Sequence, residues 1–160
     1  MFFYLFKSEL KYWLTNWTTW FYFIIFFSLT LLIFIGTAGF FDPPTESEGP
    51  TKLLNSPSSI NYMLLYFNKF LMFLLPVVVG ASVYRDFKHK TYSILYSYPF
   101  NKLDYLLAKF AASFTVVFIL SLSIGLAMIL GEHFPNLDEN VLGEIRYSAY
   151  FQSYWLYLIP

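Results

Sequence analysis

The residues best placed to do chemistry in this chain are the charged ones between Tyr84 and Phe110, in the stretch YRDFKHKTYSILYSYPFNKLDYLLAKF. This stretch holds five of the ten basic residues of the chain, and long apolar runs flank it on both sides. A positive, aromatic-rich surface beside a membrane could sit on anionic headgroups or dock a partner protein. The stretch therefore predicts a binding surface rather than a catalytic centre.

Motifs for catalysis are absent from the sequence. There is no G-x-x-x-x-G-K-[ST] to hold nucleotide phosphates and no H-E-x-x-H to hold zinc, since His89 lies in the basic stretch and His133 stands alone after Glu132. The chain has no cysteine, which excludes disulfides, thiolate metal sites and a cysteine nucleophile. We therefore predict no catalytic residue, no cofactor, no metal and no enzymatic activity in this chain.

Two adjacent polar residues, Asn68 and Lys69, interrupt the apolar run from Ile60 to Tyr84. Lys69 precedes Arg85 by about 22 Å of helix, which places it inside the edge of a bilayer. It could snorkel to the headgroups or face the interior of a helix bundle. Asn68 and Lys69 together form a candidate intramembrane polar site.

Composition places the chain outside the soluble class. It is 58% hydrophobic and only 12% charged, whereas soluble domains carry about 25% charged residues. This number of polar side chains is too small to cover a surface that faces water. We therefore expect lipid around much of the chain. The charges form no basic face, and nothing supports binding of nucleic acid.

Long apolar runs define the expected spans. A bilayer core needs about 20 residues in a helix, and we expect full spans at about 20–41, 62–84 and 110–131, with the start of a fourth at 149–160 that continues beyond Pro160. A secretory signal is the alternative for the first run, which is longer than usual for one. Residues 42–59 carry four prolines and predict an extramembrane loop without helix.

Small residues four apart suit close helix packing in the third expected span. Two such pairs occur there, Ser121 with Gly125 and Ala127 with Gly131. They indicate a packed bundle without naming a partner.

Residues 1–17 predict an amphipathic helix. Aromatic and leucine side chains recur at helical spacing, and the lysines fall on the other side; the apolar stripe is Phe2, Phe6, Leu10, Trp13 and Trp17. We expect this helix to lie in the membrane interface, with residues 18–160 as the transmembrane domain. The fold class expected is all-α: a polytopic helical membrane protein with an interfacial helix, three full spans and the start of a fourth.

The basic residues predict the orientation. Seven of the ten lie in the N-terminal segment or the stretch from Tyr84, two lie in the other loops and one is Lys69. The excess of Lys and Arg on one side predicts that the N-terminus and residues 85–109 are cytoplasmic. Within residues 85–109 we expect a turn at Tyr98-Pro99 and a helix capped by Asn101, with Asp104 in its first turn.

These residues carry a resemblance to a known family. Arg85-Asp86-Phe87, Tyr98-Pro99-Phe100 and the helix containing Lys102, Tyr105, Lys109 and Phe110 resemble the first cytoplasmic loop of type-2 permease subunits of ATP-binding-cassette transporters. The chain is most similar to the N-terminal part of long bacterial permeases of the Bacteroidetes type, some of which are fused to a zinc aminopeptidase domain. Leu54-Asn55-Ser56-Pro57 is also similar to that group.

The resemblance implies a coupling role for the stretch. Residues 85–109 would contact a separate ATPase subunit and transmit its conformational change to the spans. The coupling residues implied are Arg85, Asp86, Lys88, Asn101, Lys102, Asp104 and Tyr105. It also implies a second permease copy or half, membrane lipid around the spans, and the bacterial inner membrane as the location. Two other interpretations stay open: a non-transporting membrane anchor or assembly subunit, and the membrane portion of a membrane-bound zinc aminopeptidase.

Overall fold

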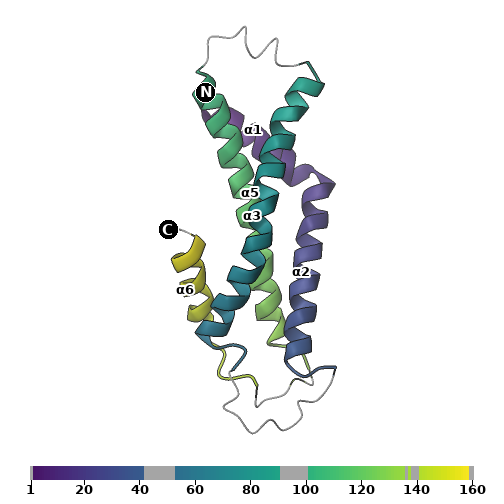
Figure 1. Cartoon of the computed structure of the whole chain (residues 1–160), viewed down its shortest axis with the longest axis vertical. Coiled ribbons are helices and arrows are strands. Elements are labelled where there is room, and N and C mark those ends of the chain that lie inside the picture. The colour runs from purple at the N-terminus through teal and green to yellow at the C-terminus, as the bar shows by residue number, and fades with distance from the viewer. Residues whose placement is uncertain (1, 42–52, 91–100, 136, 138–140, 159–160) are drawn as a thin grey trace. The chain divides into compact units, whose positions relative to one another are not determined.

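The computed structural model describes residues 2–41, 53–90, 101–135, 137 and 141–158. All regular secondary structure within these residues is helical (Figure 1). The helices are α1 (Phe2–Thr15), α2 (Trp17–Thr37), α3 (Pro57–Lys88), α5 (Lys102–Gly131) and α6 (Tyr147–Leu158). The predicted turn at Tyr98-Pro99 and most of the prolines of the 42–59 loop lie outside the described residues.

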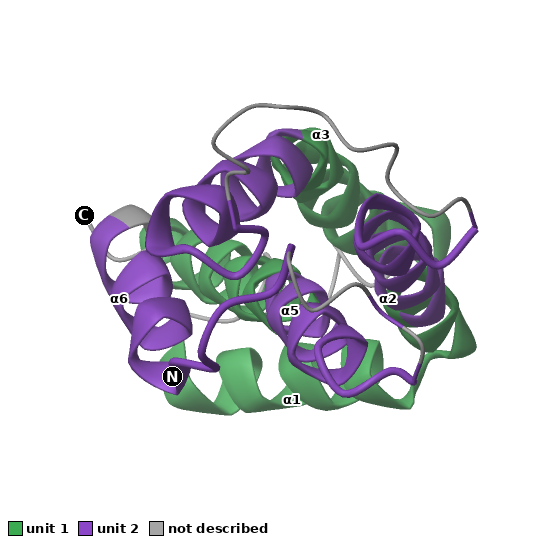
Figure 2. Ribbon diagram, turned by 90° about the horizontal axis from the view of Figure 1, so that it is seen from below, with its two compact units in different colours: residues 1–23, 70–120 green, residues 24–69, 121–160 purple. Residues whose placement is uncertain are grey.

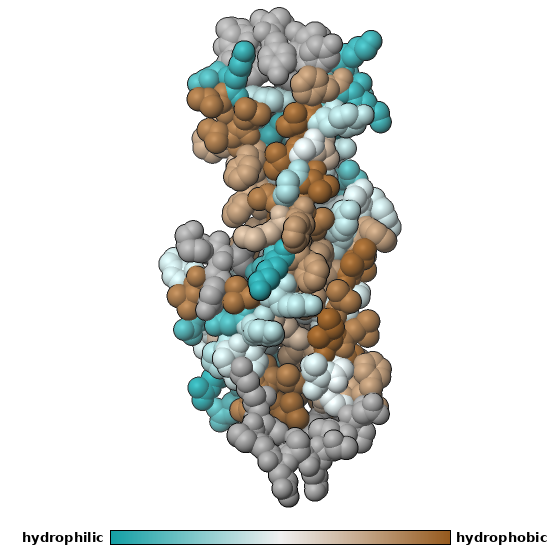
Figure 3. Space-filling model, viewed as in Figure 1, coloured by the Kyte–Doolittle hydropathy of each residue, from teal (hydrophilic) through white to brown (hydrophobic). Residues whose placement is uncertain are grey.

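Among the described residues, three helices are long and apolar enough to cross a membrane: α2, α3 and α5. This confirms the helical class, and these three candidate spans lie where the full spans are predicted. Hydrophobic residues cover much of the visible face of the long helices (Figure 3). α6 has 12 residues, about 18 Å of helix, which is too short to cross a bilayer; the fourth span and the interfacial position of α1 stay predictions.

Local chemistry sets helix ends that differ from those predicted. α2 ends at Thr37 rather than near Phe41, because Gly39 has a positive φ of 83° and the Phe40 amide donates to the Ile35 carbonyl. That arrangement is a glycine C-cap of the Schellman type.

The prediction that residues 42–59 contain no helix is wrong at their C-terminal end. α3 begins at Pro57, and the Ser56 hydroxyl accepts a hydrogen bond from the Ser59 amide at 3.3 Å. Proline is well suited to the first helical position, since its missing N–H has no partner there.

Asn16 separates α1 from α2. Its side-chain oxygen accepts a hydrogen bond from the Thr18 amide at 3.1 Å, and the Trp20 indole donates to the Leu14 carbonyl at 2.8 Å. Trp17 therefore starts a new helix and is exposed, so the predicted N-terminal stripe ends at Trp13.

The chain divides into two compact units (Figure 2): residues 1–23 with 70–120, and residues 24–69 with 121–160. In the first unit, Leu10 and Trp13 of α1 pack against Val78 of α3 and Val116 of α5. The apolar face of α1 therefore packs against α3 and α5.

The second unit has its own core and two linked loops. Large buried side chains come from α2, α3 and α5; they include Phe34, Ile60, Phe67, Ile124 and Met128. The Leu54 amide donates to the Val141 carbonyl at 3.0 Å. The segment before α3 is therefore paired with the segment before α6.

Candidate functional site

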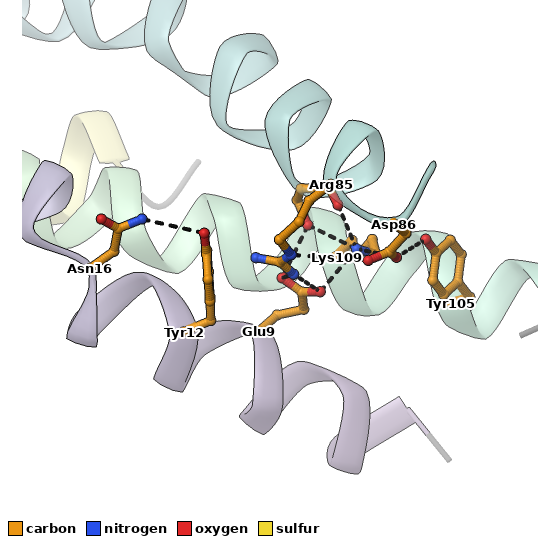
Figure 4. Close-up of polar contacts among 8 residues, drawn as sticks. Glu9, Tyr12, Asn16, Arg85, Asp86, Tyr105 and Lys109 are labelled. Atoms are coloured by element: carbon orange, nitrogen blue, oxygen red, sulfur yellow. Dashed lines mark hydrogen bonds and ion pairs between the residues drawn. The ribbon is translucent and has the colours of Figure 1, made fainter. Parts of the chain in front are cut away.

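A cluster of buried and half-buried charges lies in the first unit, where α1 meets the last turns of α3 and the first turns of α5. We define the charge cluster as Glu9 of α1, Arg85 and Asp86 of α3, and Lys109 of α5. Figure 4 shows Glu9 pointing from α1 toward Arg85 and Lys109. The cluster holds two carboxylates and two cations, so its formal charges cancel.

Glu9 connects all three helices. One Glu9 carboxylate accepts hydrogen bonds from the Arg85 guanidinium at 2.6 and 2.7 Å and from Lys109 Nζ at 2.9 Å. The Ser82 hydroxyl donates to it at 3.1 Å. Charge-assisted hydrogen bonds of this length are among the strongest hydrogen bonds in proteins. Glu9 therefore holds α1 against α3 and α5.

Lys109 is the most deeply buried member of the charge cluster. Its side chain is 3% exposed, and its ammonium group lies 2.8 Å from Asp86 Oδ2. It also donates to the Ser82 carbonyl at 2.8 Å. All three N–H donors of the ammonium therefore have acceptors available, as a buried charge requires.

Two tyrosines surround the charge cluster. The Tyr105 hydroxyl donates a hydrogen bond to Asp86, and the Arg85 guanidinium lies 3.8 Å from the centre of the Tyr12 ring. A cation over an aromatic face is favourable by about 0.5–2 kcal/mol. Arg85 Nη1 is the one buried side-chain nitrogen of the charge cluster without a hydrogen-bond partner among the described residues.

The predicted coupling residues divide between the charge cluster and the exposed surface. Arg85, Asp86 and Tyr105 belong to or contact the charge cluster, whereas Lys88 is exposed at the end of α3. α3 continues as helix to Lys88, so residues 85–88 are not loop as the predicted boundary had them.

The predicted start of the second helix is confirmed. The Asn101 side chain accepts a hydrogen bond from the Leu103 amide at 3.2 Å, and α5 begins at Lys102 with Asp104 in its first turn. Lys102 is exposed and Asp104 is half-buried at this end of α5.

Sequence reasoning missed the role of Glu9 and Lys109. The predicted apolar stripe of residues 1–17 leaves Glu9 out, yet Glu9 lies on the apolar side of α1, three residues after Phe6 and four before Trp13. Lys109 likewise stands beside the buried Ala108 in α5. The signal that could have predicted their pairing is the presence of opposite charges on the apolar faces of two helices.

The two residues of the candidate intramembrane polar site have different surroundings in the second unit. Asn68 accepts a hydrogen bond from the Ser121 hydroxyl of α5 at 2.8 Å, whereas Lys69 is exposed. Asn68 thus links two spans, and Lys69 points elsewhere.

Asn55 joins the two linked loops of the second unit. Its side-chain nitrogen donates to the Gly143 carbonyl at 2.7 Å, and its oxygen accepts from the Gly143 amide at 2.8 Å. The residue is only 5% exposed, so water cannot easily replace these bonds.

We expect Asn55→Ala to lower the free energy of unfolding by about 1–3 kcal/mol, because the partly buried backbone groups of Gly143 lose their partners. Thermal unfolding in detergent would measure the loss. Gln152→Ala, at an exposed position of α6, is the control and should change little. Equal stability of the Asn55 and Gln152 variants would contradict the assignment.

The described residues contain no group of three or more His, Asp or Glu side chains that could hold a metal ion. No protein-family model, curated protein or solved structure matches the chain.

Proposed function

We propose that the chain is the N-terminal part of a membrane-spanning permease subunit of an ATP-binding-cassette transporter. In this proposal a separate ATPase subunit binds the side that carries residues 85–109, and its closure moves the spans. The proposal rests on the resemblance of that stretch to type-2 permeases. The observation that carries it further is the charge cluster, which joins the two helices flanking the stretch to the N-terminal helix.

Coupling requires that a displacement of the segment bound by the ATPase is transmitted to the spanning helices. α3 and α5 are continuous through this region, and Lys109 binds both Asp86 of α3 and Glu9 of α1. Sliding one helix past another would separate buried opposite charges, which is costly away from water. A displacement of the end of α3 or of the start of α5 would therefore move α1, α3 and α5 together.

The residues available for docking are those that the charge cluster leaves at the surface. Phe87 and Leu103 are more than half exposed, at the end of α3 and the start of α5, and Lys88 beside Phe87 is exposed as well. An exposed aromatic ring next to a cation suits a protein interface with acidic groups at its rim. In this proposal these residues face the ATPase in the cytoplasm, the spans lie in the bacterial inner membrane, and a second permease copy or half completes the pathway.

Co-purification tests the proposal. We expect the tagged chain, extracted from its native membranes in mild detergent, to bring down an ATP-binding-cassette ATPase that mass spectrometry identifies and whose ATP hydrolysis can be measured. Lys88→Glu should weaken capture roughly tenfold, the size expected of about 1.4 kcal/mol at an interface.

The control for that variant is Lys11→Glu, which makes the same charge change at an exposed position of α1. Arg85→Glu is unsuitable, since it would break the charge cluster as well as any docking contact. Absence of an ATPase from the wild-type preparation would contradict the proposed function. Equal capture by both variants would contradict only the docking role of Lys88.

A further inference from the structure

A second buried acid, Glu132, lies in the second unit, where α6 packs against the end of α5. α6 buries Ala149, Tyr150 and Ser153, while Phe151 and Trp155 on its other side are exposed. The contact face of α6 therefore carries hydroxyl groups as well as apolar surface.

Glu132 makes the polar contact between these helices. It directly follows Gly131, the last residue of α5, and is only 9% exposed. Its Oε1 accepts a hydrogen bond from the Tyr150 hydroxyl at 2.7 Å, while its Oε2 is buried without a hydrogen-bond partner among the described residues. An ionised carboxylate offers about four acceptor sites, whereas the described residues give Glu132 a single side-chain donor, the Tyr150 hydroxyl.

The surroundings of Glu132 disfavour its negative charge. Burial raises the pKa of Glu132 above its ordinary value of 4.5, and the Tyr150 hydrogen bond and the nearby His133 oppose that rise only in part. The negative end of the α5 dipole also lies at this residue. His133 is exposed, and its Nδ1 lies 2.9 Å from the Ile129 carbonyl rather than beside the carboxylate.

We propose that Glu132 is a proton-binding site and that the bound proton holds α6 against the end of α5. In the protonated form, Oε2 carries the proton and Oε1 still accepts from Tyr150. In the charged form the carboxylate needs more donors than the described residues of the contact supply, so it draws in water and loosens the contact. This inference does not rest on the proposed transport function.

The sign of the pH dependence follows from linkage. The docked state binds the proton more tightly than the undocked state, so docking is strongest below the ordinary pKa of 4.5. The added stability is lost as the pH rises through the pKa of docked Glu132. Within that window, each pH unit weakens docking by up to about tenfold.

The absence of cysteine from the chain permits a direct test on the full chain in detergent. A single cysteine at Ser153, 2% exposed on α6, reports undocking through its rate of maleimide labelling. A single cysteine at Gln152, exposed on the same helix, controls for the pH dependence of thiol reactivity. The measured quantity is the ratio of the two rates between about pH 5 and about pH 8, above the pKa of an ordinary glutamate.

We expect the ratio to rise with pH when Glu132 is present and to stay low at every pH in Glu132→Gln, which mimics the protonated acid. Tyr150→Phe should move the rise to higher pH, because the charged carboxylate then loses the Tyr150 hydroxyl donor, which lowers its pKa. A ratio that does not change with pH in the presence of Glu132 would overturn the proposal. So would a rise of equal size in Glu132→Gln.

Discussion

Replacing Lys109 with Met is expected to lower the free energy of unfolding by about 3–5 kcal/mol, the cost of breaking a buried ion pair. Methionine fills most of the space but leaves Arg85 as the one cation of the charge cluster beside the two carboxylates of Glu9 and Asp86. The Lys109 side chain is 3% exposed, so water cannot compensate for the lost charge. Chemical unfolding in detergent micelles, followed by tryptophan fluorescence, measures the loss, since Trp13 packs against Val78 and Val116 in the same unit as the charge cluster.

Two further variants separate charge balance from packing. Lys11→Met makes the same change at an exposed position of α1 and should alter stability by less than about 0.5 kcal/mol. Adding Glu9→Gln to Lys109→Met removes one charge of each sign, so the double variant should lose less than the sum of the single losses. Additive losses would show that the charges of Glu9 and Lys109 do not act together.

Replacing Gly125 with Ala is expected to displace Tyr154 and lower the free energy of unfolding of the second unit by about 1–3 kcal/mol. A Cβ atom at Gly125 would lie 2.6 Å from the Tyr154 hydroxyl oxygen and 2.8 Å from a ring carbon. The same hydroxyl accepts a hydrogen bond from the Gly125 amide at 3.0 Å and donates to the Ser121 carbonyl at 2.7 Å. Both bonds would be lost with the displacement.

Gly80 provides the matched control, because a Cβ atom there meets nothing within 4 Å. Gly80→Ala should be neutral or stabilising, since alanine favours helix over glycine by about 1 kcal/mol. Thermal unfolding of both variants, with labelling of a cysteine at Ser153 as the reporter of α6, makes the comparison. Equal behaviour of the two variants would contradict the close contact at Gly125.

The spans could be predicted from the sequence because the signal is local. A run of about 20 apolar residues suffices, and α2, α3 and α5 appear where those runs lie. The errors at their ends also have local causes, namely the positive φ of Gly39, the proline at the first position of α3, and the cap at Asn16. Those signals were present but weaker than the hydropathy that placed the spans.

The charge cluster could not be predicted in the same way, because its contacts join distant parts of the chain. Glu9 meets Arg85 across 76 residues and Lys109 across 100 residues. Periodicity gives the face of a helix on which a residue lies, but not the helix that the face meets. The small residues of α5 show the same limit: Gly125 was predicted to permit close packing, yet its neighbour is a tyrosine side chain of α6.

The separation between Glu9 and Lys109 has a consequence for synthesis of the chain. Glu9 belongs to α1, whereas its partners Arg85 and Lys109 follow 76 and 100 residues later. At about 5–20 residues per second, the ribosome needs roughly 5–20 s to travel from Glu9 to Lys109. The carboxylate of the nascent chain must stay hydrated until the first of these partners emerges, and the complete contact of α1 with α3 and α5 can form only after α5 has begun to emerge.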